Sequence, residues 1–331
     1  DLNDMGYMKE TDYLMNETEI MYRQTDIWKI FRYNAFTLSQ KNMWNYGGTP
    51  FSNNASLRWQ SMTMNRYEWD VKETFAWNWL DSRLLRGGPD VRFGSYFLTS
   101  AKFNTDKAKR MMFMLKYEGD HNFEGNRFNT ISPSLTFRLG NHVYLSGQLD
   151  YAWNTDEMQY VATTSPLSSS SLAPYYYVMG HMDQKTYGLT LKLQVNVTPD
   201  ISIQFYGAPF TSIAKYDDFK LAADTKSHTF ENRFQRIDPD QLTYADGVYT
   251  IGEGAGQMPF RNPDFRFNEF RSNLVARWEY LPGSTLYFVW EHRMSNRDNW
   301  YSSVWGSNLD RMWGLPATNT FMIKMNYWFN L

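Results

Sequence analysis

The sequence predicts an all-β fold, a transmembrane up-and-down antiparallel β-barrel of about 14 strands, within a range of about 12 to 16. The first observation behind this prediction is alternation with a period of two. Apolar side chains occupy every second position from Tyr187 to Val197, and the positions between them hold Gly188, Thr190, Lys192, Gln194 and Asn196. The second observation is that short and long connections alternate strictly along the chain. A period of two indicates strands with two different faces, and alternating connection lengths are typical of outer-membrane barrels.

Each strand is predicted from its own alternation and from the turn residues at its ends. The predicted strands are 14–24, 27–45, 55–64, 67–79, 92–103, 109–118, 128–139, 142–154, 184–197, 201–214, 267–280, 284–295 and 319–331. Most are longer than the strands of soluble sheets and match the roughly 9–11 residues of a tilted strand that crosses a bilayer. Because bacterial barrels have an even number of strands, we expect one more strand, either within Met5 to Asp12 or upstream of this sequence.

The connections orient the barrel. Short ones, such as 140–141, 198–200 and 282–283, are predicted to be periplasmic turns. Long ones, at 47–54, 81–91, 119–127, 156–182, 216–264 and 296–318, are predicted to be extracellular loops. We expect a single barrel domain over residues 1–331, in which 1–13 is a leading segment or first strand. Within it, 217–265 is a long extracellular loop that serves as a lid, a plug or a partner surface.

The composition restricts the class of protein. Aromatic residues make up 18% of the 331 residues, the formal net charge is −2, and there is no cysteine. Many aromatic rings with little net charge exclude a disordered chain, and the absence of a basic excess argues against binding to nucleic acid. The absence of any run of about 18 apolar residues excludes a helical membrane protein, and a mean hydropathy of −0.59 suits strands with one polar face. Since a barrel of this size is too wide to be filled by side chains, the apolar face is predicted to meet lipid.

Charged residues of the polar face are the candidates for a constriction inside the barrel. They are Arg271, Arg277, Glu279, Glu291, Arg293, Lys324 and Lys192. Five of them, Arg277, Glu279, Glu291, Arg293 and Lys324, fall on three consecutive predicted strands and are expected to form an inward ladder. One interpretation is a constriction that orders a polar solute, and the other, which we favour, is a structural salt-bridge network.

Two short motifs lie outside this ladder. Arg86, Gly87, Gly88 and Pro89 form a loop motif that either presents Arg86 to an anion in the lumen or packs tightly on the barrel rim. At the C-terminus, Tyr327, Phe329 and Leu331 alternate in the manner of a signal for the barrel-assembly machinery, or simply as the lipid-facing residues of a last strand.

The sequence contains no recognisable catalytic, metal or cofactor motif. The histidines occur singly, without the close spacing of metal ligands, and no nucleophile motif accompanies them. We therefore expect no catalytic residues, no metal and no cofactor.

The chain resembles a known family in several segments. Arg277 to Tyr280 followed by Pro282 to Ser284, the Arg86 to Pro89 loop, Asn3 to Tyr7 and the closing Tyr327 to Phe329 are similar to the C-terminal barrel of domain-of-unknown-function family 5916. The resemblance covers almost the whole chain and implies an outer-membrane protein of Bacteroidota. It also implies an upstream domain similar to carbohydrate-binding family nine, and it carries over no catalytic residue.

We expect an integral protein of the bacterial outer membrane that acts as a channel, or as a membrane anchor for an upstream domain. The first alternative is a non-conducting barrel subunit of a larger outer-membrane complex, and the second is an outer-membrane hydrolase. The expected partners are outer-membrane lipid and lipopolysaccharide, the barrel-assembly machinery, and other surface proteins through the long loops.

Overall fold

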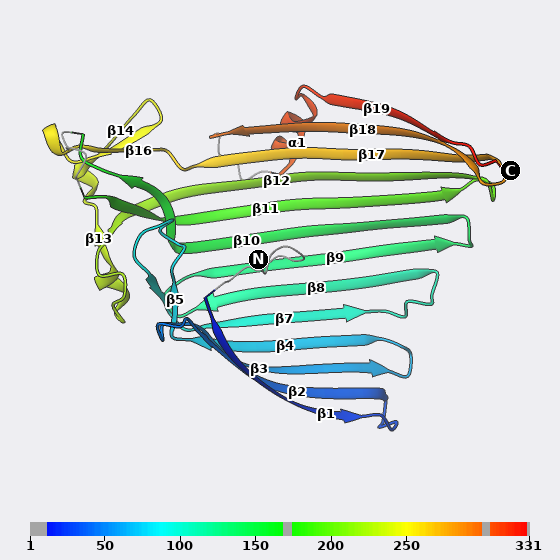
Figure 1. Ribbon diagram of the computed structural model, residues 1–331, viewed down its shortest axis with the longest axis horizontal. Coiled ribbons are helices and arrows are strands. Elements are labelled where there is room, and N and C mark those ends of the chain that lie inside the picture. Colours follow the sequence, from blue (N-terminus) through cyan, green and yellow to red (C-terminus); the bar gives the residue numbers. More distant parts are fainter. Residues whose placement is uncertain (1–11, 168–173, 300–304, 330–331) are drawn as a thin grey trace.

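The fold is dominated by one long antiparallel sheet, as a computed structural model shows (Figure 1). The structure describes residues 12–167, 174–299 and 305–329. Strands that are neighbours along this sheet are also successive in the chain, apart from short strands inserted in the loops. The sheet runs through β1 (Leu14–Gln24), β2 (Phe31–Trp44), β3 (Pro50–Thr63), β4 (Glu68–Trp77), β7 (Tyr96–Asn104), β8 (Met111–Asn122), β9 (Arg127–Leu139), β10 (Val143–Thr164), β11 (Tyr176–Asn196), β12 (Ile201–Ala222), β17 (Phe265–Leu281), β18 (Ser284–Asp298) and β19 (Thr318–Asn326). The prediction of an all-β, antiparallel, up-and-down sheet is therefore confirmed.

Each predicted strand has a counterpart in this sheet, but several boundaries were wrong. β10, β11 and β12 have 22, 21 and 22 residues, so the expected loops 156–182 and 216–264 are partly strand. The connection between β2 and β3 is only 45–49, and that between β8 and β9 is only 123–126, so both are shorter than expected. The strands continue because backbone pairing with the neighbouring strand persists beyond the region of clean alternation.

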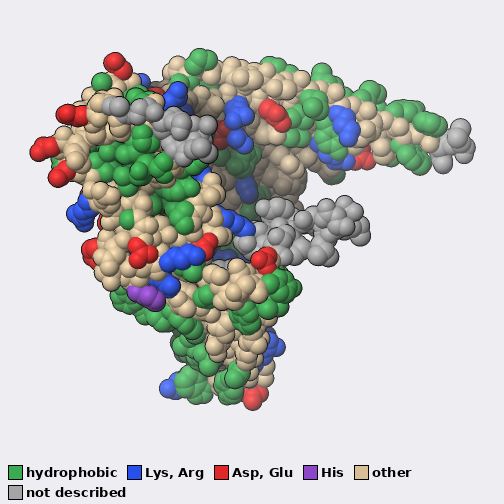
Figure 2. All heavy atoms as spheres, turned by 60° about the vertical axis from the view of Figure 1, so that its left-hand side comes forward, with side chains coloured by type: hydrophobic (Ala, Val, Ile, Leu, Met, Phe, Trp, Pro, Cys, Tyr) green, Lys and Arg blue, Asp and Glu red, His purple; other side chains and the backbone are tan. Residues whose placement is uncertain are grey.

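A closed barrel is not found in the described part of the chain. β1 and β19 are the two ends of the sheet order, and all nine residues of β19 are exposed. A fourteenth strand does belong to the sheet, but it is β13 (Phe234–Arg236), which pairs with the far end of β12 and closes nothing. The fourteenth strand expected within Met5 to Asp12 falls almost entirely on residues outside the described ranges. The sheet as described curls into an open trough, which gives the molecule a C-shaped outline in Figure 2.

The strand register aligns apolar side chains on one face of the sheet from edge to edge. Ile20 pairs with Leu38, and Leu38 pairs with Leu57. At the other end, Ala276 pairs with Phe288, and Phe288 pairs with Ile323. Many of these side chains are exposed, for example Leu57 at 57% and Ile323 at 73%. This surface is called the apolar face below, and on β17 its Phe270 packs against Trp313 of the short helix α1 (Trp305–Trp313), with ring centroids 4.9 Å apart.

The hydrophobic core of the molecule lies at the end of the sheet where the longer connections gather, at the left of Figure 1. The segment 223–264, called the cap below, contains β13 and a small sheet of β14 (Leu242–Ala245), β15 (Val248–Ile251) and β16 (Met258–Arg261). Ile251 and Phe260 of the cap pack against Val178 and Tyr216 on the extended ends of β11 and β12. A second cluster joins Phe234 of the cap to the loop containing β5 (Trp79–Asp81) and β6 (Val91–Phe93).

Candidate functional site

The polar side chains of β17 and β18 form two ion-paired groups instead of one continuous ladder. Near the short turns, a guanidinium nitrogen of Arg277 lies 2.5 Å from a carboxylate oxygen of Glu279. Further along, Glu269 accepts from both Arg271 at 2.8 Å and Arg293 at 3.0 Å. Arg271 and Arg293 are direct partners in the strand register, so one carboxylate bridges two like charges that face each other.

The other three charged candidates of the polar face stand on the same face without joining these pairs. Lys324 lies opposite Tyr287, Glu291 opposite Asn273, and Lys192 opposite Tyr206. No ion pair to any of these three charged residues occurs within the described ranges. The structure thus places all the predicted ladder residues on one polar face, and it gives Glu269 the central position that the sequence had not singled out.

The loop motif packs on the rim of the sheet. The guanidinium of Arg86 lies over the ring of Tyr160, 4.7 Å from its centroid. A Cβ added to Gly88 would lie 2.7 Å from atoms of both Leu85 and Tyr177, which is closer than side chains can approach. Gly87 has a positive φ of 105°, a region that favours glycine. These contacts account for the motif as a tightly packed turn, with Arg86 held on an aromatic ring.

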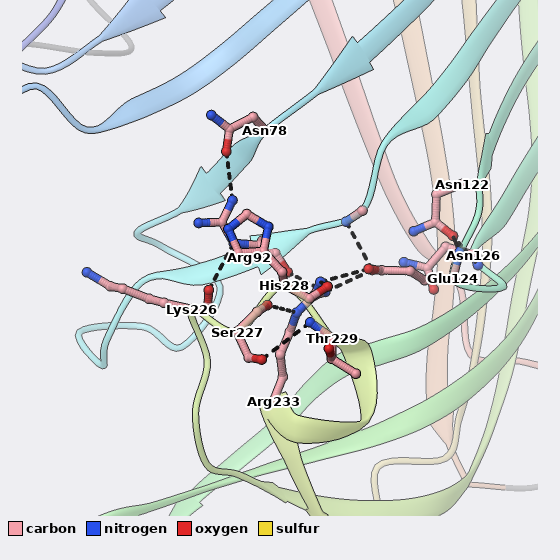
Figure 3. Close-up of polar contacts among 11 residues, drawn as sticks. Asn78, Arg92, Asn122, Glu124, Asn126, Lys226, Ser227, His228, Thr229 and Arg233 are labelled. Atoms are coloured by element: carbon pink, nitrogen blue, oxygen red, sulfur yellow. Dashed lines mark hydrogen bonds and ion pairs between the residues drawn. The ribbon is translucent and has the colours of Figure 1, made fainter.

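A buried charge pair holds the cap to the rest of the chain (Figure 3). Arg233 of the cap is 1% exposed, and its guanidinium donates to both carboxylate oxygens of Glu124, at 2.9 and 2.8 Å. The same guanidinium also donates to the carbonyl oxygens of Arg92 and Ser227, at 2.8 Å each. A forked pair of this kind is strong and geometrically specific. We call the Glu124–Arg233 pair the latch.

Glu124 is held in place by the turn that contains it. The side-chain oxygen of Asn122 accepts from the backbone N–H groups of Glu124 and Asn126, at 2.9 and 2.8 Å, which shapes the turn between β8 and β9. The Glu124 carboxylate also accepts from the N–H of Gly94, at 3.0 Å. The turn, the loop before β7 and the cap therefore meet at one carboxylate.

Further contacts join the cap to the β5–β6 loop. Arg92 donates to the side-chain oxygen of Asn78 at 2.7 Å and to the carbonyl oxygen of Lys226 at 2.9 Å. The hydroxyl of Thr225 donates to the carbonyl oxygen of Asp90 at 2.7 Å. Figure 3 shows Asn78, Arg92 and Lys226, which come from segments that are far apart in the chain, in the neighbourhood of Arg233.

Beside the cap, several titratable groups lie at the extended ends of β10 and β11. Burial raises the pKa of Asp156, and the charge of Glu157 raises it further. Burial alone would lower the pKa of His181, but a hydrogen bond to Glu157 and the charges of Glu157 and Asp183 raise it overall. His181 Nδ1 lies 3.1 Å from Glu157. These groups are outside the predicted membrane-crossing ranges and mark the base of the cap as a region sensitive to pH.

The C-terminal residues lie beyond the last strand. β19 ends at Asn326, and the rings of Tyr327 and Phe329 stack with centroids 6.3 Å apart. Both are exposed, whereas Leu331 lies outside the described residues.

Sequence reasoning did not find the latch. Glu124 and Arg233 are separated by 109 residues and fall in two expected loops without a shared motif. The glycine at position 125 and the asparagines at 122 and 126 indicate a turn, but no local pattern identifies its distant partner.

The described residues contain neither a metal-binding cluster nor a membrane-spanning helix. No cluster of three or more His, Cys, Asp or Glu side chains is arranged to hold a metal ion in residues 12–167, 174–299 and 305–329. Over the same ranges, no helix is both long and apolar enough to cross a membrane.

Comparison with known proteins gives one family. No curated protein and no solved structure matches the chain. The family described as "Domain of unknown function (DUF5916)" matches over residues 1–331. Because this match extends over the whole sequence, the chain belongs to the DUF5916 family.

Proposed function

We propose that this chain forms the wall of a β-barrel in the bacterial outer membrane and serves as a channel or as a membrane anchor for an upstream domain. The observation that carries the proposal is the apolar face, which extends from β1 to β19 and many of whose side chains are exposed. An exposed apolar surface of this extent is unfavourable in water and is typical of a surface that another apolar phase or partner covers. Acyl chains provide such a cover, and the polar opposite face then lines the lumen.

Aromatic side chains support a lipid-facing band of the expected height. On β4, Trp69 lies towards the short turns and Trp77 towards the cap, eight residues apart. At about 3.4 Å per residue they are separated by about 27 Å, close to the roughly 25 Å height of the apolar band of outer-membrane barrels before strand tilt is considered. Trp69 packs on Phe103 of the neighbouring strand, and Trp77 packs on Phe75.

The sheet requires one further strand to close in this setting. All its neighbouring strands are antiparallel, and the main path from β1 to β19 contains thirteen strands, so these two edge strands run in the same direction. One strand antiparallel to both would pair with each edge and would satisfy their backbone groups, which lipid cannot do. The candidates remain Met5 to Asp12 and an upstream segment.

The cap bears on the choice between the channel and the first alternative, a non-conducting barrel subunit. In the proposed orientation the cap lies at the extracellular end, and the latch fastens it through a buried, forked ion pair. A cap fixed in this way favours a restricted mouth. The anchor role and the non-conducting subunit role tolerate complete occlusion, whereas the channel role requires a remaining path.

The proposal is tested first by extraction and electrophoresis. A closed outer-membrane barrel is expected to require detergent for solubility and to migrate differently before and after heating. A chain that is soluble without detergent would contradict the proposal.

Conductance in planar bilayers then separates the roles. Discrete conductance steps would support the channel. A heat-modifiable barrel that conducts no ions would exclude the open channel and support the anchor or the subunit. Co-purification of a partner in mild detergent would then favour the subunit over the anchor.

A further inference from the structure

Two adjoining hollows lie on the polar face, where β10, β11, β12 and β17 run side by side. The first has a volume of about 350 Å³ and the second about 470 Å³, and Tyr206 lines both. Each is within the size range of small-molecule sites. Their walls belong to the sheet itself.

Small residues create the second hollow. Ala208 stands between Tyr206 and Phe210 on the same face of β12, and Gly188 is the register partner of Phe210 on β11. A Cβ added to Gly188 would meet no atom closer than 3.6 Å, so the position opens space without being required by tight packing. A shallow floor is thereby bounded by an aromatic ring at each end.

The polar lining contains unused hydrogen-bonding groups. The side-chain oxygen of Asn273 is buried and has no hydrogen-bond partner within the described residues. Gln194 and Gln204, which are directly paired across β11 and β12, line the same hollow with exposed amides. Amides next to an aromatic ring suit a ligand that has hydroxyl groups on its edge and an apolar C–H surface on its face, which describes a sugar ring.

The charges of the site favour an anion. Lys192 has no ion pair within the described ranges, although it stands beside Tyr206. Arg271 shares the single carboxylate of Glu269 with Arg293, so the two guanidiniums retain free donors. The one other acid of the lining, Asp150, accepts from Ser132 at 2.6 Å and from Gln148 at 2.9 Å. The charged groups left available to a ligand are therefore the cations Lys192 and Arg271, and the forked guanidinium of an arginine suits a carboxylate.

We propose that these hollows form a binding site for an acidic sugar, a pyranose that carries a carboxylate. The ring packs against Tyr206, which lines both hollows, the carboxylate is bound by Lys192 and Arg271 from the two neighbouring strands, and the hydroxyls bond to the amides of the first hollow. The site becomes part of the lumen wall if the proposed barrel is correct, and to that extent it rests on the proposed function.

The experiment measures ligand binding to the purified full chain in detergent, by saturation-transfer NMR and calorimetry. Sodium D-glucuronate is the probe, D-glucose lacks its carboxylate, and sodium acetate lacks its ring. We expect glucuronate to bind about tenfold more tightly than either comparison ligand, the change produced by one additional favourable contact. Equal affinity for glucose and glucuronate would overturn the acidic specificity, and equal affinity for acetate would overturn the sugar.

Two variants test the assigned residues. Lys192→Gln is expected to weaken glucuronate binding about fivefold and to leave glucose binding unchanged, because an exposed ion pair contributes modestly. Tyr206→Ala is expected to weaken both sugars. The matched control is Lys72→Gln, an exposed lysine on the polar face of β4, far along the sheet from the site. If Lys192→Gln behaves like Lys72→Gln, the assignment is wrong.

This experiment and the test of the barrel can fail independently. If the protein shows heat-modifiable electrophoretic mobility but does not bind glucuronate, only the proposal of the sugar site is contradicted. If the chain binds glucuronate specifically but is soluble without detergent, the sugar site is supported and the barrel is contradicted.

Discussion

At the scale of single residues, Arg233 is a charge that is held away from water. It is almost completely buried, and Glu124 is 13% exposed on its side-chain surface. Removing one partner of such a pair leaves the other charge buried without compensation, which costs about 3–5 kcal/mol. The latch therefore stabilises the cap only when both of its charged partners are present.

We predict that Arg233→Met destabilises the cap by about 3 kcal/mol or more, measured as faster amide hydrogen exchange in residues 223–264. The double variant Arg233→Met with Glu124→Gln is expected to recover part of this loss, because the buried carboxylate is then neutral. Lys226 provides the control, since it pairs with Asp90 at 2.8 Å but is 56% exposed. Lys226→Met is expected to cost no more than about 1 kcal/mol. Equal effects of the two single variants would show that the latch does not hold the cap.

The second residue-scale prediction concerns pH. Since burial raises the pKa of Asp156, the closed cap binds a proton there more readily than the opened one. Stability at this site is therefore gained as pH falls through the raised pKa towards the ordinary value of about 3.9, and it is lost as pH rises. His181 acts in the same direction at higher pH, because its pKa is also raised.

Asp156→Asn removes the charge that burial disfavours. We predict that exchange in the cap at neutral pH is slower in this variant than in the unmodified protein, and that the difference narrows at pH values near the carboxyl range. The groups that face Asp156 and titrate or carry charge are Asp120, Glu157, His181, Tyr216 and Lys220, and they are unchanged in the comparison. A constant ratio of exchange rates across pH would contradict the assignment.

At the scale of elements, the strands and their two faces were predictable because alternation is a local property. The spacing of Leu189, Leu191 and Leu193 predicts from the sequence alone that they share one face of a strand, and they do so in β11. The extended ends of the strands were not predictable in this way. The register shifts between Asp156 and Gln159 and again between Tyr160 and Ala162, and such irregularities reverse the alternation on which the prediction depends.

The candidate site was predictable only in part. The polar-face charges of β17 and β18 follow from alternation and from a two-residue turn, which together fix which side chains lie opposite each other. The hollows around Tyr206 and the latch depend on strands or loops brought together by the whole sheet. No spacing in the sequence contains that information.

At the scale of the whole molecule, the two free edges make a prediction about closure. A strand inserted between β1 and β19 would hold them about 9.6 Å apart, twice the spacing of neighbouring strands, which is too far for a disulfide. Because the sequence has no cysteine, any disulfide within the chain must join the two introduced cysteines. We predict that Tyr22→Cys combined with a cysteine at Phe321, Ile323 or Met325 forms no disulfide but is joined by a longer bifunctional reagent.

The positive control is Ile20→Cys with Leu38→Cys, which are direct partners on β1 and β2. Efficient disulfide formation between β1 and β19 would mean that the edges pair directly in parallel, and it would exclude an intervening strand. Failure of both reagents would mean that the edges remain apart.

The latch also determines an order of assembly. Most neighbouring strands of the sheet are joined by short connections and can pair as successive hairpins at little entropic cost. The contacts that hold the cap are different, since Arg233 reaches Glu124 and Arg92 across 109 and 141 residues. These contacts become available only after β8 and β12 have been placed in one sheet. The cap is therefore expected to close last, so that a folding chain passes through a stage in which its strands are paired and that end is still unsealed.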